Sequence, residues 1–444
     1  MSSLTQTQQK ALLFASAAAL RLLLAAAFPT LPPLLTGRVE LSTPVNSFKR
    51  LQEGLFLYDN GLSPYDGGLF HQAPLLLPLF SLLPDPATYP LFTILLYTIL
   101  DLAAAQALID IAQSAQASLS RFYSSPRKHL ALAPIYVAAA YLFNPFTLLT
   151  CLARPTSVLG NLFTLLAISK ACAGAPITSA FSLALASYVS LHPLLLAPPL
   201  TILCYDVVSA RSTAQSSDET PAKQTQSPSA AQRSLAAFAT RQTITLALFI
   251  ALLFVLSFVL TGQSWSFLAS VYGTRLLLPD LTPNVGLWWY FFIEMFDSFR
   301  AFFLAVFWLH MAAYSPALTI RLRRQPLAAV MLLIGVFAIF QPYANVGDAG
   351  LWLSALTVFA HLADLSRYPF PALSALLYTT FLAPAFYYLW IYAGSGNANF
   401  FYAITLVWSL ALSVLLGDFL YAVLRDEWEL ERPEMKGRRD VARI

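Results

Sequence analysis

The sequence TITLALFIALLFVLSFVL, residues 243–260, decides the class of fold, because it contains no charged side chain. A helix that crosses a bilayer needs about 20 mainly apolar residues, so this segment is predicted to span a membrane. The whole 444-residue chain is similar, with 58% hydrophobic and only 11% charged residues. Soluble domains carry about 25% charged residues. The composition therefore excludes a disordered chain, a disulfide scaffold and a nucleic-acid-binding domain, and it predicts a polytopic membrane protein.

Apolar segments recur on both sides of 243–260 and predict an all-α fold with about twelve transmembrane helices. A further segment, 75–83, is too short to cross and is expected to be re-entrant or interfacial. The predicted spans are residues 11–28, 89–112, 132–150, 157–172, 177–192, 194–205, 243–260, 288–312, 327–341, 349–363, 373–392 and 400–423.

The positions of Lys and Arg orient these helices, because cytosolic loops carry the excess of basic residues. If the N-terminus is cytosolic, most basic loop residues fall on the cytosolic side. The opposite loops then contain only Arg38, Lys49, Arg50, Arg154 and Arg275. This asymmetry requires an even number of spans, so both termini are predicted to be cytosolic.

Loop composition divides the chain into four parts. Residues 1–210 are expected to form an N-terminal transmembrane bundle with a lumenal loop at 29–73, and residues 242–424 a C-terminal transmembrane bundle. Between them, the polar composition of 211–241 is typical of a flexible cytosolic connector. Residues 425–444 are expected to form a charged cytosolic tail. The lumenal loops are rich in Asn, Pro, Gly and Tyr, and such loops on a rigid frame often carry function.

Motifs of soluble-type catalysis and metal binding are absent from the sequence. There is no HExxH, GxSxG, Walker or Rossmann pattern. The three cysteines, Cys151, Cys172 and Cys204, show no CxxC spacing, and the five histidines are scattered without ligand spacing. We therefore expect no metal site, no cofactor and no catalytic residue of these kinds.

The first lumenal loop carries an amphipathic segment at 47–58, then GLSPY at 61–65, and an apolar run that begins at Pro74. This order resembles the first lumenal loop of the GT-C glycosyltransferases, which use dolichol-phosphate sugars. Those enzymes place one or two acidic residues just after the first helix, as base and metal-organising groups. Here Glu40 has no carboxylate beside it, and Asp59 and Asp66 lie in turn sequences. The loop therefore predicts a GT-C-like fold without the paired acids.

Ionisable residues inside predicted spans are candidate functional positions, because each costs about 2.5–3.5 kcal/mol to insert. Glu294, Asp297 and Arg300 share one helical face. This spacing predicts a local ion-pair network or a polar groove for a lipid headgroup or partner helix. The aromatic residues around them are typical of an interfacial belt or of a slot for acyl chains. The other ionisable residues within spans are Arg21, Asp101 and Asp110.

The last lumenal loop contains Asn397 and Asn399, which would project to one side of an extended segment. Their amides can bind sugar hydroxyls and phosphate oxygens without a charge. The alternative interpretation is a turn in which Asn399 caps the following helix.

Several stretches, in order along almost the whole chain, resemble the PIG-U family of multi-span GPI transamidase subunits. The most specific is the seventeen-residue run DLTPNVGLWWYFFIEMF at 280–296. The supporting stretches are SPY at 63–65 with Phe70-His71, FNPF at 143–146, QPYANVGD at 341–348 and NANFFYAIT at 397–405. Two features depart from the family pattern. Gln341 and Pro342 stand where the family tends to have Lys-Ser, and the polar sequence at 211–234 matches no part of the pattern.

The resemblance implies a non-catalytic subunit in the endoplasmic reticulum membrane that binds and presents the GPI lipid for attachment to precursor proteins. It implies a GT-C-like fold. The implied partners are the GPI lipid and the other transamidase subunits, among them a caspase-like peptidase, and not nucleic acid. The Asn residues would bond the glycan or phosphate of the lipid, and the aromatic residues would contact its chains. The candidate lipid-binding residues are Asn397, Asn399, Phe400, Tyr290, Phe292 and Glu294.

Two alternatives come from other classes of protein. A GT-C mannosyltransferase that acts on a lipid-linked glycan would use Glu40 as its base. A transporter or flippase would require inverted repeats and broken mid-membrane helices, and the sequence contains no convincing repeat.

Overall fold

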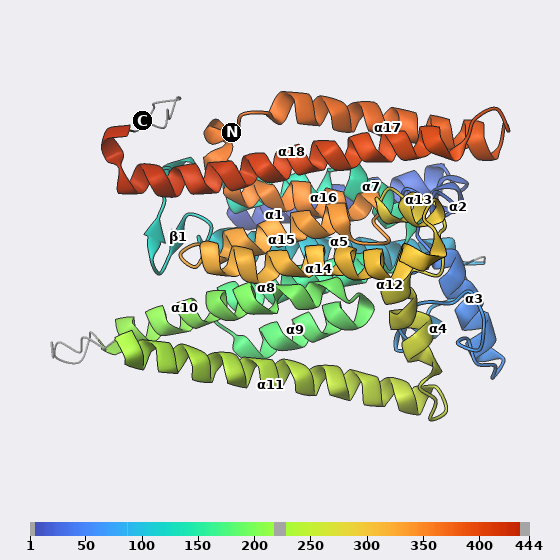
Figure 1. Cartoon of the computed structure of the whole chain (residues 1–444), viewed down its shortest axis with the longest axis horizontal. Coiled ribbons are helices and arrows are strands. Elements are labelled where there is room, and N and C mark those ends of the chain that lie inside the picture. Colours follow the sequence, from blue (N-terminus) through green and yellow to red (C-terminus); the bar gives the residue numbers. More distant parts are fainter. Residues whose placement is uncertain (1–4, 87, 217–227, 436–444) are drawn as a thin grey trace.

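The computed structural model describes residues 5–86, 88–216 and 228–435 and consists of long helices packed side by side (Figure 1). Among these residues the only paired strands are β1 (Leu119–Ser120) and β2 (Tyr123–Ser124), which are antiparallel. The α-helices are α1 (Gln6–Ala27), α2 (Leu31–Thr36), α3 (Phe48–Asp59), α4 (Leu76–Ser81), α5 (Pro90–Gln113), α6 (Pro134–Leu142), α7 (Pro145–Ala153), α8 (Ser157–Cys172), α9 (Pro176–Val189), α10 (Ala197–Ser216), α11 (Pro228–Leu260), α12 (Thr274–Leu277), α13 (Trp288–Ile293), α14 (Asp297–Arg321), α15 (Pro326–Phe340), α16 (Val346–Ala355), α17 (Pro369–Ile391) and α18 (Ala398–Glu431). The short helices are η1 (Lys128–Leu130), η2 (His192–Leu196), the π-helix η3 (Leu268–Gly273), η4 (Leu356–Leu365) and η5 (Pro433–Met435).

Helix α15 lies at the centre of the bundle. Its sequence is apolar on every side, as expected of a helix surrounded by protein, and its residues from Pro326 to Ile339 are all buried. It packs against α10, α14, α16 and α18, and thus against both halves of the chain. A Cβ atom at Gly335 would lie 2.5 Å from the ring of Trp352, so glycine is what allows α16 to approach so closely. The indole of Trp352 also donates to the carbonyl of Met331 at 3.0 Å.

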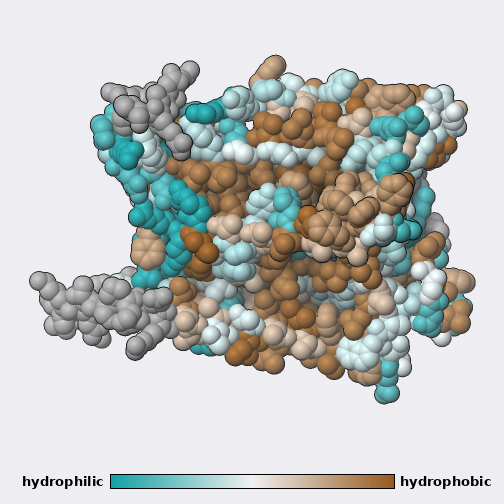
Figure 2. Space-filling model, viewed as in Figure 1, coloured by the Kyte–Doolittle hydropathy of each residue, from teal (hydrophilic) through white to brown (hydrophobic). Residues whose placement is uncertain are grey.

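The two ends of the bundle differ. The first-loop helices α2, α3 and α4 gather with α12 and α13 at one end, on the right of Figure 1. The hairpin of β1 and β2, the end of α18 and the facing ends of α10 and α11 lie at the other end. Figure 2 shows a broad hydrophobic surface across the middle of the molecule, with hydrophilic residues gathered towards its ends.

Every predicted span coincides with one helix or with two consecutive helices, which confirms a polytopic all-α membrane protein. Within the described part of the chain, eight helices are long and apolar enough to cross a membrane, or nine if the bent pair α6–α7 is one span. Helices α8, α9 and α15 are apolar but have only 16, 14 and 15 residues. The total of about twelve would require these three to cross as well, so it stays a prediction. The segment 75–83 contains only the six-residue helix α4.

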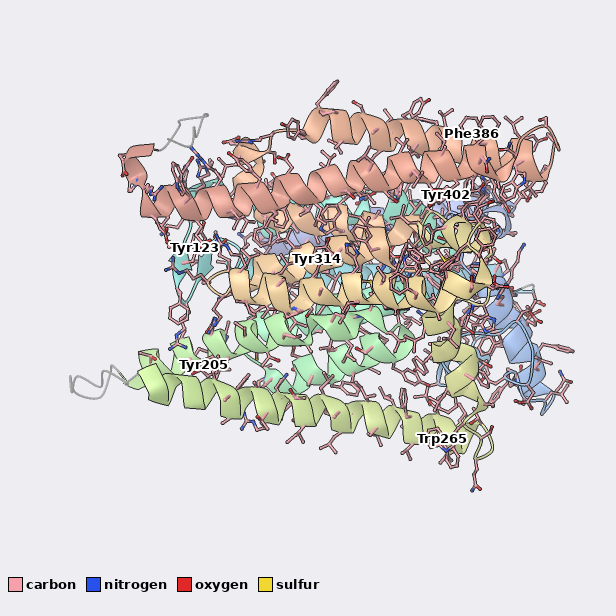
Figure 3. The ribbon with its side chains drawn as sticks, in the orientation of Figure 1. Tyr123, Tyr205, Trp265, Tyr314, Phe386 and Tyr402 are labelled. Carbon is pink, nitrogen blue, oxygen red and sulfur yellow. The ribbon has the colours of Figure 1, made fainter. Side chains whose placement is uncertain are left out.

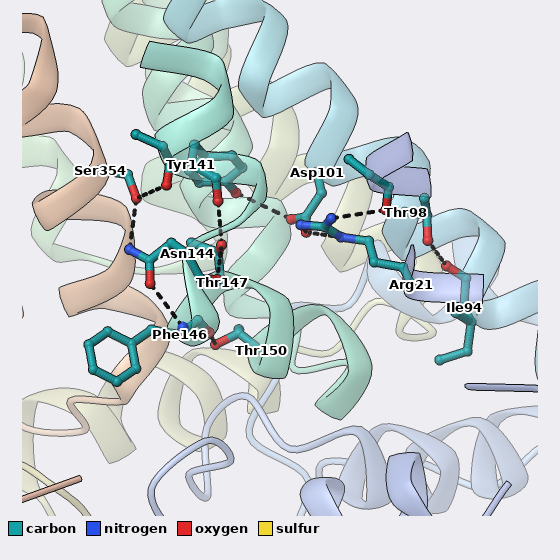
Figure 4. Close-up of polar contacts among 12 residues, drawn as sticks. Arg21, Ile94, Thr98, Asp101, Tyr141, Asn144, Phe146, Thr147, Thr150 and Ser354 are labelled. Carbon is teal, nitrogen blue, oxygen red and sulfur yellow. Dashed lines mark hydrogen bonds and ion pairs between the residues drawn. The ribbon is translucent and has the colours of Figure 1, made fainter. Parts of the chain in front are cut away.

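The predicted span 132–150 is bent rather than straight, by 53° between α6 and α7. The bend falls at Asn144-Pro145. The Asn144 side chain accepts from the amide of Phe146 at 2.9 Å and donates to Ser354 Oγ at 2.9 Å, as Figure 4 shows. Proline at the first position of a helix has no amide hydrogen to lose there, so Asn144 and Pro145 together begin a new helix.

The predicted single span 288–312 was wrong. Helix α13 ends at Ile293 and α14 begins at Asp297, with Glu294 in the break between them. The three charged residues of this region therefore do not lie along one continuous helix. No two of Glu294, Asp297 and Arg300, all within the described residues, form an ion pair. Arg300 donates instead to the carbonyl of Leu278 at 2.6 Å.

Helices occupy part of the expected connector and tail. Residues 211–216 belong to α10 and 228–241 to α11, whereas 217–227 lie outside the described residues. Residues 425–431 continue α18, where Asp426 is fully buried and bonds Arg127 at 2.6 Å. On the same end, Arg323 bonds Asp206 at 2.6 Å. These ion pairs hold the end of α18, the hairpin region and α10 to the bundle, and residues 436–444 lie outside the described part.

An ion pair inside the bundle joins α1 to α5. Arg21 is fully buried, and its Nη2 lies 2.9 Å from Oδ2 of Asp101 (Figure 4). Asp101 also accepts from the hydroxyl of Tyr141 at 3.2 Å, and Arg21 donates to the carbonyl of Ala17 at 3.2 Å. A charge buried in this way requires a partner inside the protein. Arg21 and Asp101, both ionisable residues within predicted spans, are therefore explained by their ion pair with each other.

We predict that Arg21→Leu destabilises the protein by about 3 kcal/mol, because it leaves Asp101 buried without its cation. The combined Arg21→Leu and Asp101→Leu variant should recover much of that loss, since no charge remains unpaired. Thermal unfolding of the purified chain in detergent measures both effects. Lys10→Leu, at a half-buried position near the start of the same helix, removes a charge that has no ion-pair partner among the described residues; it is the control and should change little. Equal stability of the single and double variants would contradict the role of the pair.

Candidate lipid-binding site

Asn397 and Asn399 lie at the start of α18 rather than on an extended segment. Asn397 is the N-cap residue, and its side-chain oxygen accepts from the amide of Phe400 at 3.2 Å. Asn399 lies in the first turn, where its side-chain oxygen accepts a hydrogen bond from the hydroxyl of Tyr290. The capping role considered for Asn399 thus belongs to Asn397. Both Asn residues are exposed, so one face of each amide stays open to a ligand.

The structure brings together five of the six candidate residues. Tyr290 comes from α13 and meets Asn399 of α18. Partial burial and the nearby negative charge of Glu294 raise the pKa of Tyr290. Phe400 follows Asn399, is 54% exposed, and stacks on Phe386 of α17 with 5.8 Å between ring centroids. Amide, phenol and carboxylate groups thus share a small exposed surface edged by aromatic rings.

Phe292 is the candidate that does not reach this surface. It is only 2% exposed and packs against Trp288, Phe291 and Phe307 inside the protein. Helix α13 turns Tyr290 outward and Phe292 inward because residues two apart point to different sides of a helix.

Beneath the exposed surface lies an aromatic cluster formed by Trp289, Tyr290, Trp390, Phe401 and Tyr402. The rings of Tyr290 and Tyr402 are 4.6 Å apart, and Trp289 stacks on Trp390 at 6.2 Å. Tyr402 also donates to the carbonyl of Leu287 at 3.1 Å. Figure 3 shows Tyr402 and Phe386 at the end of the α17–α18 hairpin next to α13. The cluster fixes α13 against both helices of the hairpin.

An apolar cavity of about 150 Å³ opens beside this cluster, between α17, α18, α7 and the first loop. Ala383 and Ile404 belong to its wall and also pack with Trp289 and Phe401. Thr379 and Thr380 line it as well, but their hydroxyls bond carbonyls of their own helix. The wall is therefore almost entirely apolar and continues the buried side of the aromatic cluster.

One ion pair lies at the border of this apolar cavity. Arg38 contacts both carboxylate oxygens of Glu40, at 2.8 and 3.1 Å, and its guanidinium lies 5.7 Å from the ring of Tyr387. Glu40 is 7% exposed, and its backbone carbonyl accepts from the amide of Val346 at 2.9 Å. The carboxylate expected at the position of a catalytic base is thus bound by its neighbour.

Sequence reasoning missed the apolar cavity because its wall comes from segments far apart in the chain. One signal was available. Helix α17 is rich in exposed aromatic residues, yet Thr379, Thr380, Ala383 and Pro384 form a patch of small residues on it. Within residues 5–86, 88–216 and 228–435, no three His, Cys, Asp or Glu side chains lie close enough to hold a metal ion.

Fold and site together define a multi-span helical membrane protein with an exposed polar surface above an apolar cavity, an arrangement suited to an amphipathic ligand. The family model "GPI transamidase subunit PIG-U" matches residues 15–408. The chain belongs to the PIG-U family, as the sequence motifs predicted.

Known relatives cover nearly the whole chain. The GPI transamidase component GAB1 of Saccharomyces cerevisiae is 36% identical over 423 residues, which are 94% of this chain and 95% of the relative. The human GPI-anchor transamidase component PIGU is 35% identical over 417 residues, 90% of this chain and 91% of the relative. The GAB1 homolog of Schizosaccharomyces pombe is 34% identical over 406 residues, 89% of each chain.

We predict that Asn397→Ala lowers stability by about 1 kcal/mol, because α18 loses its N-cap. Asn397→Ser should retain most of the stability, since a serine oxygen can accept the same amide hydrogen bond. Asn399→Ala removes only the bond to Tyr290 on an exposed surface and should cost less than Asn397→Ala. Thermal unfolding of the three variants tests the order, and a larger loss for Asn399→Ala would contradict the assignment of the cap.

Proposed function

We propose that this chain is a non-catalytic subunit of the GPI transamidase in the endoplasmic reticulum membrane that binds the GPI lipid and presents it for attachment. The carrying observation is that the exposed surface of Asn397, Asn399 and Tyr290 adjoins an aromatic cluster, and that this cluster packs against Ala383 and Ile404 of the apolar cavity's wall. A GPI lipid has a polar glycan and phosphate at one end and hydrocarbon chains at the other. The Asn amides suit the glycan and phosphate, and the apolar cavity suits the hydrocarbon chains.

In this proposal the Asn amides and the Tyr290 hydroxyl hydrogen-bond the glycan or phosphate of the lipid. Phe400, which is half exposed, covers the start of a chain, and the cavity takes part of that chain. Glu294 borders the polar surface and places its negative charge near Tyr290. Phe292 does not contact the lipid in this proposal; it supports α13 by packing against Trp288 inside the protein.

The peptidase of the complex is proposed to be a separate, caspase-like chain, with which this subunit and the other transamidase subunits assemble. The names of the relatives, which are components of the transamidase, support membership in such a complex. A GT-C-like fold with both termini cytosolic remains part of the proposal. Purification of the chain in mild detergent, followed by mass spectrometry, should recover a caspase-like peptidase. Its consistent absence would contradict this assembly.

We predict that Asn397→Ser combined with Asn399→Ala lowers GPI attachment several-fold while the complex still assembles. Serine keeps the cap of α18, so the loss would report on ligand contacts rather than on folding. The measurement is surface display of a GPI-anchored reporter in cells that depend on the variant, with protein abundance recorded in parallel. Asn60→Ala, an exposed asparagine after α3, is the matched control and should attach the reporter normally. Normal attachment with the double variant would rule out the assignment.

The mannosyltransferase alternative makes a different prediction for Glu40. We expect Glu40→Gln to leave transfer of mannose from dolichol-phosphate mannose unchanged in membranes, because Arg38 already occupies both carboxylate oxygens. The assay follows labelled mannose into lipid-linked glycans and compares it with the Arg38→Gln variant, which disrupts the same ion pair but leaves the carboxylate. Loss of transfer with Glu40→Gln alone would favour the enzyme over the subunit.

A further inference from the structure

A second, polar cavity lies elsewhere at the first-loop end of the bundle. It has a volume of about 50 Å³ and lies between the first loop, the start of α8, the α9–η2 junction, α12 and the turn from α15 to α16. A site of 10–15 Å³ holds one water molecule, so this cavity has room for a group of several heavy atoms. Its polar lining includes Asn46, Thr156, Ser157, Ser190, Arg275 and Gln341.

Arg275 is the distinctive residue of the polar cavity. It is 9% exposed, donates to Ser190 Oγ at 2.7 Å and to the carbonyl of Val45 at 3.3 Å, and its Nε has no hydrogen-bond partner. No carboxylate of the described residues lies within 4.0 Å of it. Burial lowers its pKa to about 10, so the guanidinium is still charged at neutral pH. A buried guanidinium that no carboxylate contacts leaves a place for an anion beside it.

Asp348 also lines the polar cavity, but its carboxylate is already engaged. Its Oδ2 accepts from the backbone amide of Asn345 at 3.2 Å, from the Asn345 side chain at 2.7 Å and from the side chain of Gln341. The bond from the Asn345 amide, together with a bond from the Asp348 amide to Asn345 Oδ1 at 3.3 Å, forms the capping box at the start of α16. The carboxylate therefore stabilises a helix end and does not neutralise Arg275 by direct contact.

Two further features of the cavity favour an anion. The Ser157 hydroxyl is buried and has no hydrogen-bond partner. Ser157 is the first residue of α8, a 16-residue helix, and the N-terminal end of a helix carries partial positive charge, although the amides of Val158 and Leu159 already donate to backbone carbonyls. The helix end and the guanidinium thus face the same small space from different parts of the chain.

The backbone around Arg275 is held firmly in place. Arg275 is the second residue of α12, which follows directly after the π-helix η3, a rare conformation that is frequent at functional sites. The Ser270 hydroxyl donates to the carbonyl of Tyr65 at 3.1 Å, and Tyr272 donates to the carbonyl of Tyr188 at 2.8 Å. The guanidinium is therefore positioned before any ligand arrives.

We propose that the polar cavity binds a phosphate group, with Arg275 as its cation, the Ser157 hydroxyl as a further donor and the partial positive charge at the start of α8 as added support. A guanidinium fork matches the geometry of phosphate oxygens. The phosphate belongs either to a lipid headgroup or to a free anion, which share this chemistry. None of these residues belongs to the surface of Asn397, Asn399 and Tyr290, so the proposal does not depend on the proposed function.

The test uses the full chain, purified with its accompanying subunits in neutral detergent and depleted of lipid. The probes are inorganic phosphate, dioleoyl phosphatidic acid and, as the phosphate-free control, dioleoylglycerol. A bound ligand stabilises the folded state, so thermal unfolding against probe concentration gives the affinity. Either phosphate probe, or both, should stabilise the wild type, and dioleoylglycerol should not. Stabilisation by phosphatidic acid alone identifies a lipid headgroup, and stabilisation by inorganic phosphate identifies the free anion.

The variants separate binding from folding. Arg275→Gln should weaken binding about tenfold or more, because the charge-assisted hydrogen bonds are lost. Ser157→Ala should weaken phosphate binding several-fold without removing a buried charge. If Arg275→Gln does not fold, the affinity of Ser157→Ala decides whether the cavity binds phosphate. The control is Arg154→Gln. Arg154 is also buried, at 6% exposure, with an unpartnered Nε, but it lies over Phe48 and does not line the cavity.

Arg154→Gln should bind the probes as the wild type does. The proposal is overturned if neither phosphate probe stabilises the wild type, or if dioleoylglycerol acts as strongly as phosphatidic acid. It is also overturned if Arg275→Gln, or Ser157→Ala where that variant decides, leaves the affinity unchanged. An equal loss in Arg154→Gln and Arg275→Gln would likewise overturn it, because the effect would then follow from any buried arginine.

Discussion

The arrangement of both cavities depends on the turn that joins α15 to α16. Helix α15 is buried on all sides, and the turn after it ends in the capping box of Asn345 and Asp348. The amide of Val346 donates to the Glu40 carbonyl at 2.9 Å, which ties the first loop to this turn. Val346 lines the apolar cavity, whereas Asn345 and Asp348 line the polar one. The capped start of α16, which follows the buried helix α15, thus lies between the apolar cavity and the polar cavity.

The sequence predicted the helices well because their signal is local. An uncharged segment of membrane length is helical whatever surrounds it, since its backbone must satisfy its own hydrogen bonds in lipid. Breaks within apolar segments were harder to foresee. The bend at Asn144 follows from a cap and a proline, whereas the break at Glu294 separates two helices that are both apolar and aromatic. The polar cavity could not be predicted, because residues as distant as Asn46, Ser157, Arg275 and Gln341 meet only through tertiary packing.

The same distinction between local structure and tertiary packing applies to the site residues that the sequence suggested. Asn397, Asn399 and Phe400 are neighbours in the chain, so their common exposed surface follows from local structure. Their contact with Tyr290 depends on how α13 packs on the α17–α18 hairpin; the family resemblance made Tyr290 a candidate for lipid contacts but did not predict this contact. Phe292 has the same chemistry as Phe400 but the opposite exposure, at 2% against 54%. Residue type alone could not distinguish the two, because helix phase decides which ring faces out.

The charged residues of the bundle fall into two groups: those held in an ion pair, which have a structural role, and those that can still bind a ligand. Arg21, Arg38, Arg50 and Arg127 each have a carboxylate within 3.0 Å. Such pairs offset the cost of burial and leave little for a ligand. Glu40, the one acid at the position of a sugar transferase base, is among the paired groups, so proton transfer there would first require Arg38 to leave. Arg275 has no such partner, and the amides of Asn397 and Asn399 carry no charge. The groups open to a ligand at this end are therefore mainly hydrogen-bond donors, which favours recognition of phosphate and sugar over acid–base catalysis.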